Sequence, residues 1–382
     1  MESKYLFAIA ILLILAAGLV QFNGFTGFFT ANEQKQESIK IGFLADLSGD
    51  SAKYGEMVKK GFDLAVEEIN AKGGVDGRKL APIYEDTRSS ASIGVSGAKK
   101  LIEVDGVSVI LGLTSSQIAL SVAPVAEKSK TIMFTPIASA PSLKYAGDYV
   151  FRNTVTAEPH GKKIAEFAFY NLSAKTAASL YINSDNGIAY NEVFTKNFIQ
   201  LGGKILVSES FEKGAKDFKT SLLKIKEKNP NMIYFGGNGF EIAVKQAREL
   251  QLDSIFIASP GAENKELLQL AGKAAEGLYY SYSAFDPDGT EPHVVSYQKS
   301  FLAKYGEKSE AYEANSYDMV VLVAKAMKEC GDKNTDCIRD YLYSVKNYSG
   351  VGGLTTFDSF GEVTKPLVIK TVKDGKFVKY SS

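Results

Sequence analysis

The feature that most constrains this chain is an alternation of short β-branched or apolar runs with amphipathic segments, which begins near Ile39 and starts afresh near Glu158. Such alternation is typical of parallel sheets covered by helices on both faces. Two series of this kind predict an α/β fold with two Rossmann-like lobes. The predicted strands are 39–45, 79–86, 107–112, 131–136 and 149–152 in the first series, and 177–183, 204–211, 231–237, 254–260 and 276–283 in the second.

Amphipathic periodicity predicts helices between these strands, and a helix-rich stretch follows the second series. The end of the chain returns to strands at 354–358 and 367–380, where Asp374-Gly375 predicts a hairpin turn. The predicted helices are 54–71, 92–104, 116–128, 158–171, 190–201, 217–228, 240–251, 294–305, 312–329 and 335–345.

Composition narrows the classes of function. The 382 residues include 44 Lys and Arg against 44 Asp and Glu, so the formal net charge is zero. A nucleic-acid-binding protein normally carries a basic excess, which argues against that class. Two histidines and two cysteines are too few for zinc or iron–sulfur clusters, so we expect no metal and no cofactor. His160 and His293 stand at predicted helix starts, where we expect them to be exposed.

The N-terminus carries an apolar run from Tyr5 to Val20, with no charged residue between Tyr5 and Asn32. The run is longer than most signal-peptide cores and slightly short of the roughly 20 residues that span a bilayer. We assign residues 1–31 to a signal or membrane anchor, and we favour a retained N-terminal hydrophobic helix because no clean cleavage site follows. The polar segment 32–38 is the linker, and the body of the chain is expected to be extracytoplasmic, in the periplasm or at the cell surface.

Cys330 and Cys337 lie close together and are the only cysteines in the sequence. In an exported protein such a pair forms a local disulfide, here predicted to fasten a helix–loop–helix corner. Closing so short a loop stabilises the fold by about 2–3 kcal/mol in the chain-entropy model. Asn171 and Asn347 fit the N-glycosylation pattern, which matters only if the host glycosylates its exported proteins.

Three loops of the first series follow strands and precede helices, at 47–55, 112–117 and 135–141. In open parallel sheets, ligands bind at the carboxyl ends of the strands, beside helix N-termini. Backbone N–H groups, the helix dipole and serine hydroxyls together favour a carboxylate there. N-capping alone would explain Ser115-Ser116, but three such loops on neighbouring strands predict a carboxylate-binding site. Asp46 after the first strand either reaches this site or caps its own turn.

The same loops lie in stretches that resemble the branched-chain amino-acid-binding proteins of ABC transporters. The stretches are IGFLADLSGDSAKYGEMVKKGFDLAVEEINAKGGVDGRKL from Ile41, ILGLTSSQIALSVAPVAEKSKTIMFTPIASAPSL from Ile110 and KDFKTSLLKIKEKNPNMIYFGG from Lys216. The resemblance implies the type I periplasmic-binding fold, in which two lobes are joined by three crossovers and close on the ligand by hinge motion. It implies an N-terminal lobe of 39–154 plus 285–353, a C-terminal lobe of 155–284 plus 354–382, and crossovers near 154–157, 284–287 and 353–357.

The resemblance also implies roles for residues of the first lobe. The α-carboxylate is held by a serine that matches Ser116, assisted by Ser115, and by a backbone amide in the loop of Ile137, Ala138 and Ser139. The ammonium takes a carbonyl and a hydroxyl from that same loop. The aromatic residue that lines the side-chain pocket matches Tyr54. Charge-assisted hydrogen bonds of this kind are strong in a closed, dry cleft.

The second lobe departs from the family's pattern. Asn186 stands where the family usually has a tyrosine over the ligand, and Asn238 stands where an aromatic residue often follows the Gly-Gly pair. Pro260 matches the acidic residue that often receives the ammonium, and Glu263 lies three positions further on. We therefore include Asn186, Asn238 and Glu263 in the predicted site, and leave open whether the ligand is a leucine-like amino acid, a polar one, or a related carboxylate or amide.

These observations predict an extracytoplasmic solute-binding protein that captures an amino acid or similar small molecule and delivers it to ABC permease subunits. The expected partners are the ligand, the permease and, through the N-terminal helix, the membrane, with the protein itself monomeric. A ligand-binding sensory protein of the same fold is the alternative. An enzyme is a distant alternative, because no nucleophile elbow, phosphate loop or zinc motif is present.

Overall fold

The computed structural model describes residues 37–381. The predicted membrane anchor, residues 1–31, and most of the predicted linker lie outside these residues. Among residues 37–381 no helix combines the length and the apolar character that crossing a membrane requires.

The first lobe is built on a parallel sheet of five strands in the order β2-β1-β3-β4-β5. Strands β1, β3 and β4 are almost fully buried, as expected for a sheet covered by helices on both faces. The strand order reverses direction between β1 and β3, which is where open sheets of this kind bind ligands. The strands are β1 Ile39–Ala45, β2 Leu80–Asp86, β3 Val109–Gly112, β4 Ile132–Thr135 and β5 Val150–Arg152, and the covering helices are α2 Ala52–Ala71, α3 Ala91–Lys99 and α4 Ser116–Lys128.

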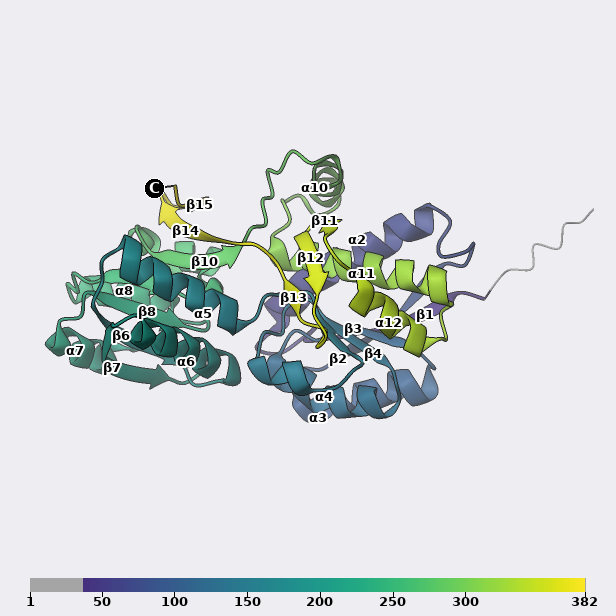
Figure 1. Cartoon of the computed structure of the whole chain (residues 1–382), viewed down its shortest axis with the longest axis horizontal. Coiled ribbons are helices and arrows are strands. Elements are labelled where there is room, and N and C mark those ends of the chain that lie inside the picture. The colour runs from purple at the N-terminus through teal and green to yellow at the C-terminus, as the bar shows by residue number, and fades with distance from the viewer. Residues whose placement is uncertain (1–36, 382) are drawn as a thin grey trace, which may run out of the picture. The chain divides into compact units, whose positions relative to one another are not determined.

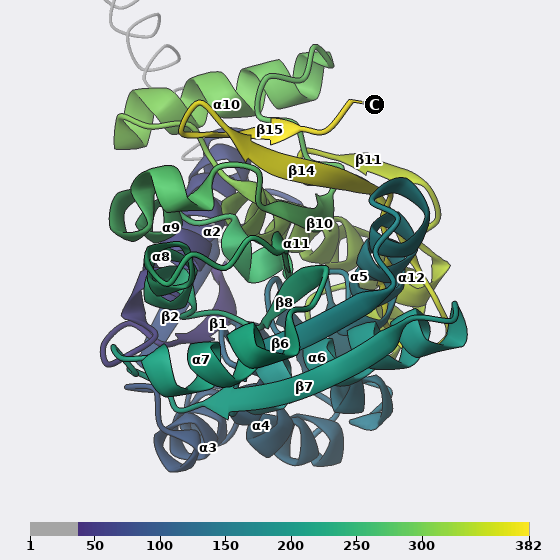
Figure 2. The ribbon, with the colours of Figure 1, turned by 90° about the vertical axis from the view of Figure 1, so that its left-hand side faces the viewer.

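The second lobe repeats the design beside the first (Figure 1). Its sheet has the order β15-β14-β10-β9-β8-β6-β7, parallel from β7 to β10 and antiparallel at β14 and β15. Figure 2 looks onto this lobe and shows β15 and β7 at opposite edges. The elements are β6 Thr176–Ile182, β7 Lys204–Phe211, β8 Met232–Gly236, β9 Ile255–Ala258, β10 Tyr279–Ser283, β14 Leu367–Lys373 and β15 Lys376–Lys379, with α5 Ala157–Glu166, α6 Asp185–Gln200, α7 Lys219–Lys228, α8 Glu241–Glu249 and α9 Lys265–Leu270.

Several element boundaries differ from the sequence prediction for local reasons. The predicted helices 92–104 and 158–171 each end in a π-helical turn, at Lys100–Val104 and Phe167–Asn171. Helix α6 begins five residues earlier than predicted, because the Ser184 hydroxyl caps the N–H of Gly187 at 3.3 Å. The hairpin predicted at Asp374-Gly375 is present, with both residues at positive φ, 53° and 66°.

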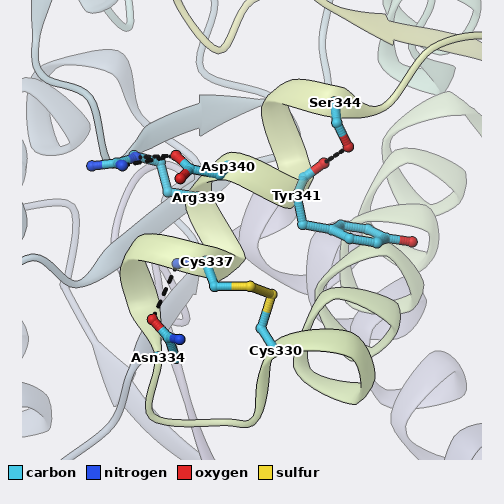
Figure 3. The surroundings of a disulfide bond; sticks show 7 residues. All are labelled: Cys330, Asn334, Cys337, Arg339, Asp340, Tyr341 and Ser344. Carbon is cyan, nitrogen blue, oxygen red and sulfur yellow. Dashed lines mark hydrogen bonds and ion pairs between the residues drawn. A yellow bond between two sulfur atoms is a disulfide. The ribbon is translucent and has the colours of Figure 1, made fainter.

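The C-terminal helices α10 Pro292–Tyr305, α11 Ala311–Cys330 and α12 Thr335–Ser344 follow the second lobe in sequence. Helix α11 packs along α2, so the chain returns to the first lobe. A disulfide joins Cys330, at the end of α11, to Cys337 in the first turn of α12, with their Cα atoms 5.6 Å apart (Figure 3). The Asn334 side chain caps α12 by accepting the N–H of Cys337 at 3.2 Å.

The third connection between the lobes lies further along the chain than the predicted 353–357. Strands β11 Tyr348–Gly350, β12 Gly353–Phe357 and β13 Val363–Thr364 form a small antiparallel sheet. Phe357 and Val363 are buried in the core of the first lobe, where Phe357 packs edge-on against Phe134. The segment 354–364 therefore belongs to the first lobe rather than the second, and the chain passes over at 365–366.

The third connection is fixed by a buried polar cluster. Lys365, which is 6% exposed, donates to the side-chain oxygen of Asn315 at 2.6 Å and to the carbonyl of Gly352 at 3.1 Å. Asp318 accepts the N–H groups of Val351 and Gly352 at 2.9 and 2.7 Å. Burial raises the pKa of Asp318 to about 6 and lowers that of Lys365 to about 8. These contacts fasten the end of the small sheet to α11.

Candidate functional site

A cavity of about 490 Å³ lies where the carboxyl ends of the two parallel sheets face each other. It is lined from the first lobe by the loops after β1, β3 and β4, and from the second by the loops after β6, β8 and β9. Eight of the nine predicted ligand-binding residues line this cavity. They are Tyr54, Ser115, Ser116, Ile137, Ala138, Ser139, Asn186 and Asn238.

The N-terminus of α4 forms the polar part of the first-lobe wall. Ser115 stands at the N-cap position, but its side chain makes no capping hydrogen bond. The N–H groups of the first helical turn and the Ser115 hydroxyl are therefore left without the usual internal partner, next to the cavity that Ser115, Ser116 and Gln117 line. An uncapped helix N-terminus with adjacent hydroxyls is suited to a carboxylate.

The second loop of this wall is held by side-chain oxygens of its own lobe. Ser116 Oγ accepts the N–H groups of Ser139 and Ala140 at 3.2 and 3.1 Å. Thr135 Oγ1 accepts the N–H of Ala138 at 3.0 Å and donates to the carbonyl of Leu113 at 2.8 Å. The backbone amides that we expected to bind a carboxylate are thus occupied in this arrangement, while the Ser116 hydroxyl keeps its own proton to donate.

Asp46 has a structural role beneath this wall. It is fully buried and accepts hydrogen bonds from the hydroxyls of Thr87 and Thr114, the latter at 2.8 Å. The Asp46 N–H in turn donates to Thr114 Oγ1 at 3.2 Å. One carboxylate therefore ties together the loops after β1, β2 and β3, and Asp46 is absent from the cavity lining.

Contacts across the cavity join the two lobes. Asn186 Nδ2 donates to Ser139 Oγ at 2.8 Å, and Asn238 Nδ2 donates to the Tyr54 hydroxyl at 3.3 Å. Both pairs combine a predicted residue of one lobe with a predicted residue of the other. At the rim, Lys213 lies 3.4 Å from Asp50, and both side chains are exposed. The structure is therefore that of the two lobes closed upon each other.

Four aromatic residues of the wall were not predicted from the sequence: His160, Tyr190, Tyr282 and Tyr312. Tyr190 lies one helical turn after Asn186 on α6, so the i, i+4 spacing was the signal that could have found it. Burial raises the pKa of Tyr190 to about 12 and that of Tyr282 and Tyr312 well above its usual value. Their hydroxyls consequently keep their protons at neutral pH.

The prediction that His160 is exposed is wrong. His160 lies in the first turn of α5, is 4% exposed, and has its Nδ1 3.0 Å from the Ser281 hydroxyl on β10. Burial lowers the pKa of His160 to about 3, so the ring is neutral. The local sequence at the start of α5 did not indicate burial, because the element that covers it is β10, a strand more than 100 residues further along the chain. His293 is exposed, as predicted.

Glu263 is the predicted residue that the structure does not bring to the cavity. It lines a second cavity of about 790 Å³, separated from the first by residues common to both linings, Tyr54, Pro260, Gly261 and Tyr312. Its carboxylate forms a nearly buried ion pair with Lys370 and accepts the Tyr280 hydroxyl at 2.5 Å. Both carboxylate oxygens are thus committed to partners within the second lobe.

The polar side chains that line the cavity are mostly hydroxyls, amides and phenols, with the imidazole of His160 and the charged Lys213 and Asp185. Among residues 37–381 no three His, Cys, Asp or Glu side chains come together in a way that could hold a metal ion.

Two hinged α/β lobes that enclose a polar cavity at their facing strand ends define a solute-binding protein of the type I periplasmic-binding fold. The predicted fold is confirmed for the described residues.

Comparison with known proteins identifies the family. A family model of periplasmic binding proteins matches residues 38–376, and the chain belongs to that family, whose name places its members outside the cytoplasmic membrane. A relative in Pseudomonas aeruginosa, a leucine-, isoleucine-, valine-, threonine- and alanine-binding protein, is 27% identical over 339 residues, which is 88% of this chain and 90% of the relative.

Solved structures agree with this assignment. A leucine-binding protein from Thermotoga maritima has a TM-score of 0.84 and 27% identity, covering 90% of this chain and 98% of its own. The branched-chain amino acid transporter substrate-binding protein of Streptococcus pneumoniae, solved with isoleucine, has a TM-score of 0.82 and 30% identity, covering 90% of this chain and 100% of its own. The chain therefore shares the fold of these substrate-binding proteins.

Proposed function

We propose that the cavity binds a small solute bearing a carboxylate, an α-amino acid or a close relative, and that the closed protein delivers it to ABC permease subunits without converting it chemically. The observation that carries this proposal is the uncapped N-terminus of α4 at the cavity wall. The names of the relatives include several amino acids that share the α-amino carboxylate, which supports the same common group.

The geometry suggests how each part of such a solute is held. The carboxylate accepts hydrogen bonds from the first-turn N–H groups of α4 and from the hydroxyls of Ser115 and Ser116. The ammonium faces the carbonyl groups of the loop from Ile137 to Ser139, and the Ser139 hydroxyl. The remainder of the solute points toward the aromatic and amide side chains of the second lobe.

Closure is coupled to binding because the cavity is formed by both lobes. The hydrogen bonds Asn186–Ser139 and Asn238–Tyr54 exist only when the lobes meet. A solute that contacts both walls therefore favours the closed state by its differential affinity for that state. Release to the permease requires the lobes to part about the three connections at 153–156, 284–288 and 365–366.

A thermal-shift screen of amino acids and small carboxylates, followed by calorimetry, tests the proposal. A ligand present at 100 times its Kd stabilises the folded state by about 2.7 kcal/mol, which is a readily measured shift in melting temperature. Binding of at least one α-amino carboxylate is expected. If no small carboxylate shifts the melting temperature while the protein melts cooperatively, the proposal is wrong.

We further propose that the N-terminal apolar run is retained as a transmembrane anchor and that the tethered protein is monomeric. The support comes from the sequence, which lacks both a clean cleavage site and a cysteine that could carry a lipid. Tethering would raise the effective concentration of the lobes near the permease. Mass spectrometry of the native protein decides this: a mature N-terminus between about Ala17 and Glu37, in a soluble fraction, would show a cleaved signal.

A further inference from the structure

The second-lobe wall of the cavity contains a histidine whose proton can be located from its contacts. His160 Nδ1 lies 3.0 Å from Ser281 Oγ, and Ser281 Oγ donates to the carbonyl oxygen of His160 at 3.1 Å. A hydroxyl has one proton to donate, and a carbonyl only accepts. Because the Ser281 proton goes to the carbonyl, the hydrogen bond at Nδ1 must be donated by the imidazole.

A neutral imidazole with its proton on Nδ1 presents a bare lone pair on Nε2. Ser281 is the one hydrogen-bond partner of the His160 ring among residues 37–381, and His160 is 4% exposed and lines the cavity. The His160 ring centroid lies 6.3 Å from that of Tyr190, which lines the same cavity. The wall therefore offers an uncharged acceptor that the protein itself leaves unsatisfied.

Tyr282 adds a second unsatisfied polar group to this wall. Its side chain is 4% exposed, lines the cavity from β10, and makes no hydrogen bond with any residue in 37–381. Burial keeps the phenol protonated, so it can donate as well as accept. Both groups line the cavity, so a bound solute that pairs with them is favoured over one that covers them without pairing.

We propose that His160 and Tyr282 select solutes that carry a neutral hydrogen-bond donor, a hydroxyl or a carboxamide, in addition to the carboxylate. The inference rests on the proposed function, because it assumes that the carboxylate occupies the α4 N-terminus across the cavity. An aliphatic side chain would cover Nε2 and the phenol without pairing with either.

The charges around the cavity favour a neutral donor over a cationic one. Asp185 is the only carboxylate among the described residues that line the cavity, and it is exposed. Glu263, the acidic residue that was predicted from the sequence to lie in the site, is paired with Lys370 outside this cavity. A cationic side chain would therefore lose its hydration without gaining a counter-charge, which is costly.

Two isosteric ligand pairs test the selection by calorimetry: threonine against valine, and asparagine against leucine. We expect the donor-bearing member of at least one pair to bind more tightly by about tenfold or more. His160→Leu and Tyr282→Phe should each shrink that ratio, while His293→Leu, the exposed histidine, should leave it unchanged. Tyr282→Phe removes a single oxygen, so it keeps the experiment valid if His160→Leu fails to fold.

The outcomes separate the inference from the proposed function. If valine and leucine bind as tightly as their polar partners, or if a solute without a neutral donor is the tightest in a wider screen, the inference is overturned and the proposed function stands. An unchanged ratio in both variants also overturns it. If no small carboxylate binds at all, the proposed function fails, and the inference with it. Long-range proton–nitrogen NMR spectra supply a separate readout: a proton on Nε2 of His160 in the free protein would contradict the assigned acceptor.

Discussion

The two walls of the cavity are built in different ways. In the first lobe, consecutive residues of two loops hold each other through Ser116 and Thr135, and one carboxylate, Asp46, fastens three loops from below. In the second lobe, the wall combines the loops after β6, β8 and β9 with side chains of α5, α6 and β10. The first wall is locally prearranged, whereas the second is a product of packing between distant elements.

This difference assigns different tasks to the two lobes. A wall whose hydroxyls are already oriented by neighbouring amides binds a constant group, the carboxylate, at little cost in ordering. A wall whose residues come from several separate elements can change a residue in one element without disturbing the others. We therefore expect the second lobe to decide the identity of the solute.

The largest effect is expected from breaking the support of the first wall. Arg152 is 2% exposed, donates to both oxygens of Glu362 at 2.5 and 2.6 Å, and donates to the carbonyl of Ala140 at 2.7 Å. Arg152→Met should lower the free energy of unfolding by about 3–5 kcal/mol, because it leaves Glu362 buried and unpaired. Denaturant titration measures this.

The matched control for that change is Lys213→Met, which breaks the exposed pair with Asp50. An exposed pair contributes under about 1 kcal/mol, so this variant should unfold nearly as the parent does. Equal effects of Arg152→Met and Lys213→Met would contradict the view that the first wall depends on a buried ion pair.

Burial of His160 predicts a pH dependence that the first wall does not share. Its pKa is about 3 in the folded state and near 6.5 when unfolded, so only the unfolded chain takes up a proton between those values. Stability should therefore fall with decreasing pH below 6.5, by about 2 kcal/mol on reaching pH 4.5. The measurement is the difference in unfolding free energy between the parent and His160→Gln across this range.

The difference in unfolding free energy between the parent and His160→Gln separates the contribution of His160 from that of other buried titratable groups. Burial raises the pKa of Asp318 to about 6 and that of Glu313 to about 7. These groups bind protons more readily in the folded state, so they act in the opposite direction as the pH falls. Parallel pH profiles for the parent and His160→Gln would show that the histidine is not buried in neutral form.

A smaller effect is expected at the carboxylate site. Ser116→Ala removes a hydroxyl that can donate to the solute and that also accepts two N–H groups of the facing loop. Affinity for the solute should fall by about 1–3 kcal/mol, with similar losses for every carboxylate tested, because the first wall holds their common group. Ser121→Ala, on the same helix but outside the cavity lining, is the control for calorimetry. An unchanged Kd for Ser116→Ala would remove this residue from the site.

The smallest effect is expected where the walls meet. Tyr54→Phe removes the acceptor of the hydrogen bond from Asn238 while leaving the ring in place. Because this bond forms only on closure, the affinity should fall by about 0.5–1.5 kcal/mol without a comparable change in the stability of the free protein. Tyr170→Phe, on the exposed surface, is the matched control. A loss of affinity confined to one type of solute would instead place Tyr54 among the selecting residues.

Sequence patterns located most of the fold and the first wall, because both depend on local spacing. Alternating strands and helices follow from the periodicity of apolar residues, and β1, β7 and α10–α12 lie within a few residues of their predicted positions. Ser115, Ser116 and the loop from Ile137 to Ser139 could be found because they follow strands directly, and the ends of parallel strands in one sheet must lie together.

Only the tertiary structure decided the rest, because those features depend on partners far away in the sequence. The predicted strand 354–358 has the same sequence pattern whichever sheet it joins, and burial of Phe357 against Phe134 places it in the first lobe. Glu263 was predicted to lie in the ligand site, but in the folded protein it pairs with Lys370, which is 107 positions later in the sequence. The local sequence of His160 likewise specified a helix start and nothing more. Burial in the folded protein keeps the ring neutral, and Ser281, which lies 121 positions later in the sequence, determines which ring nitrogen carries the proton.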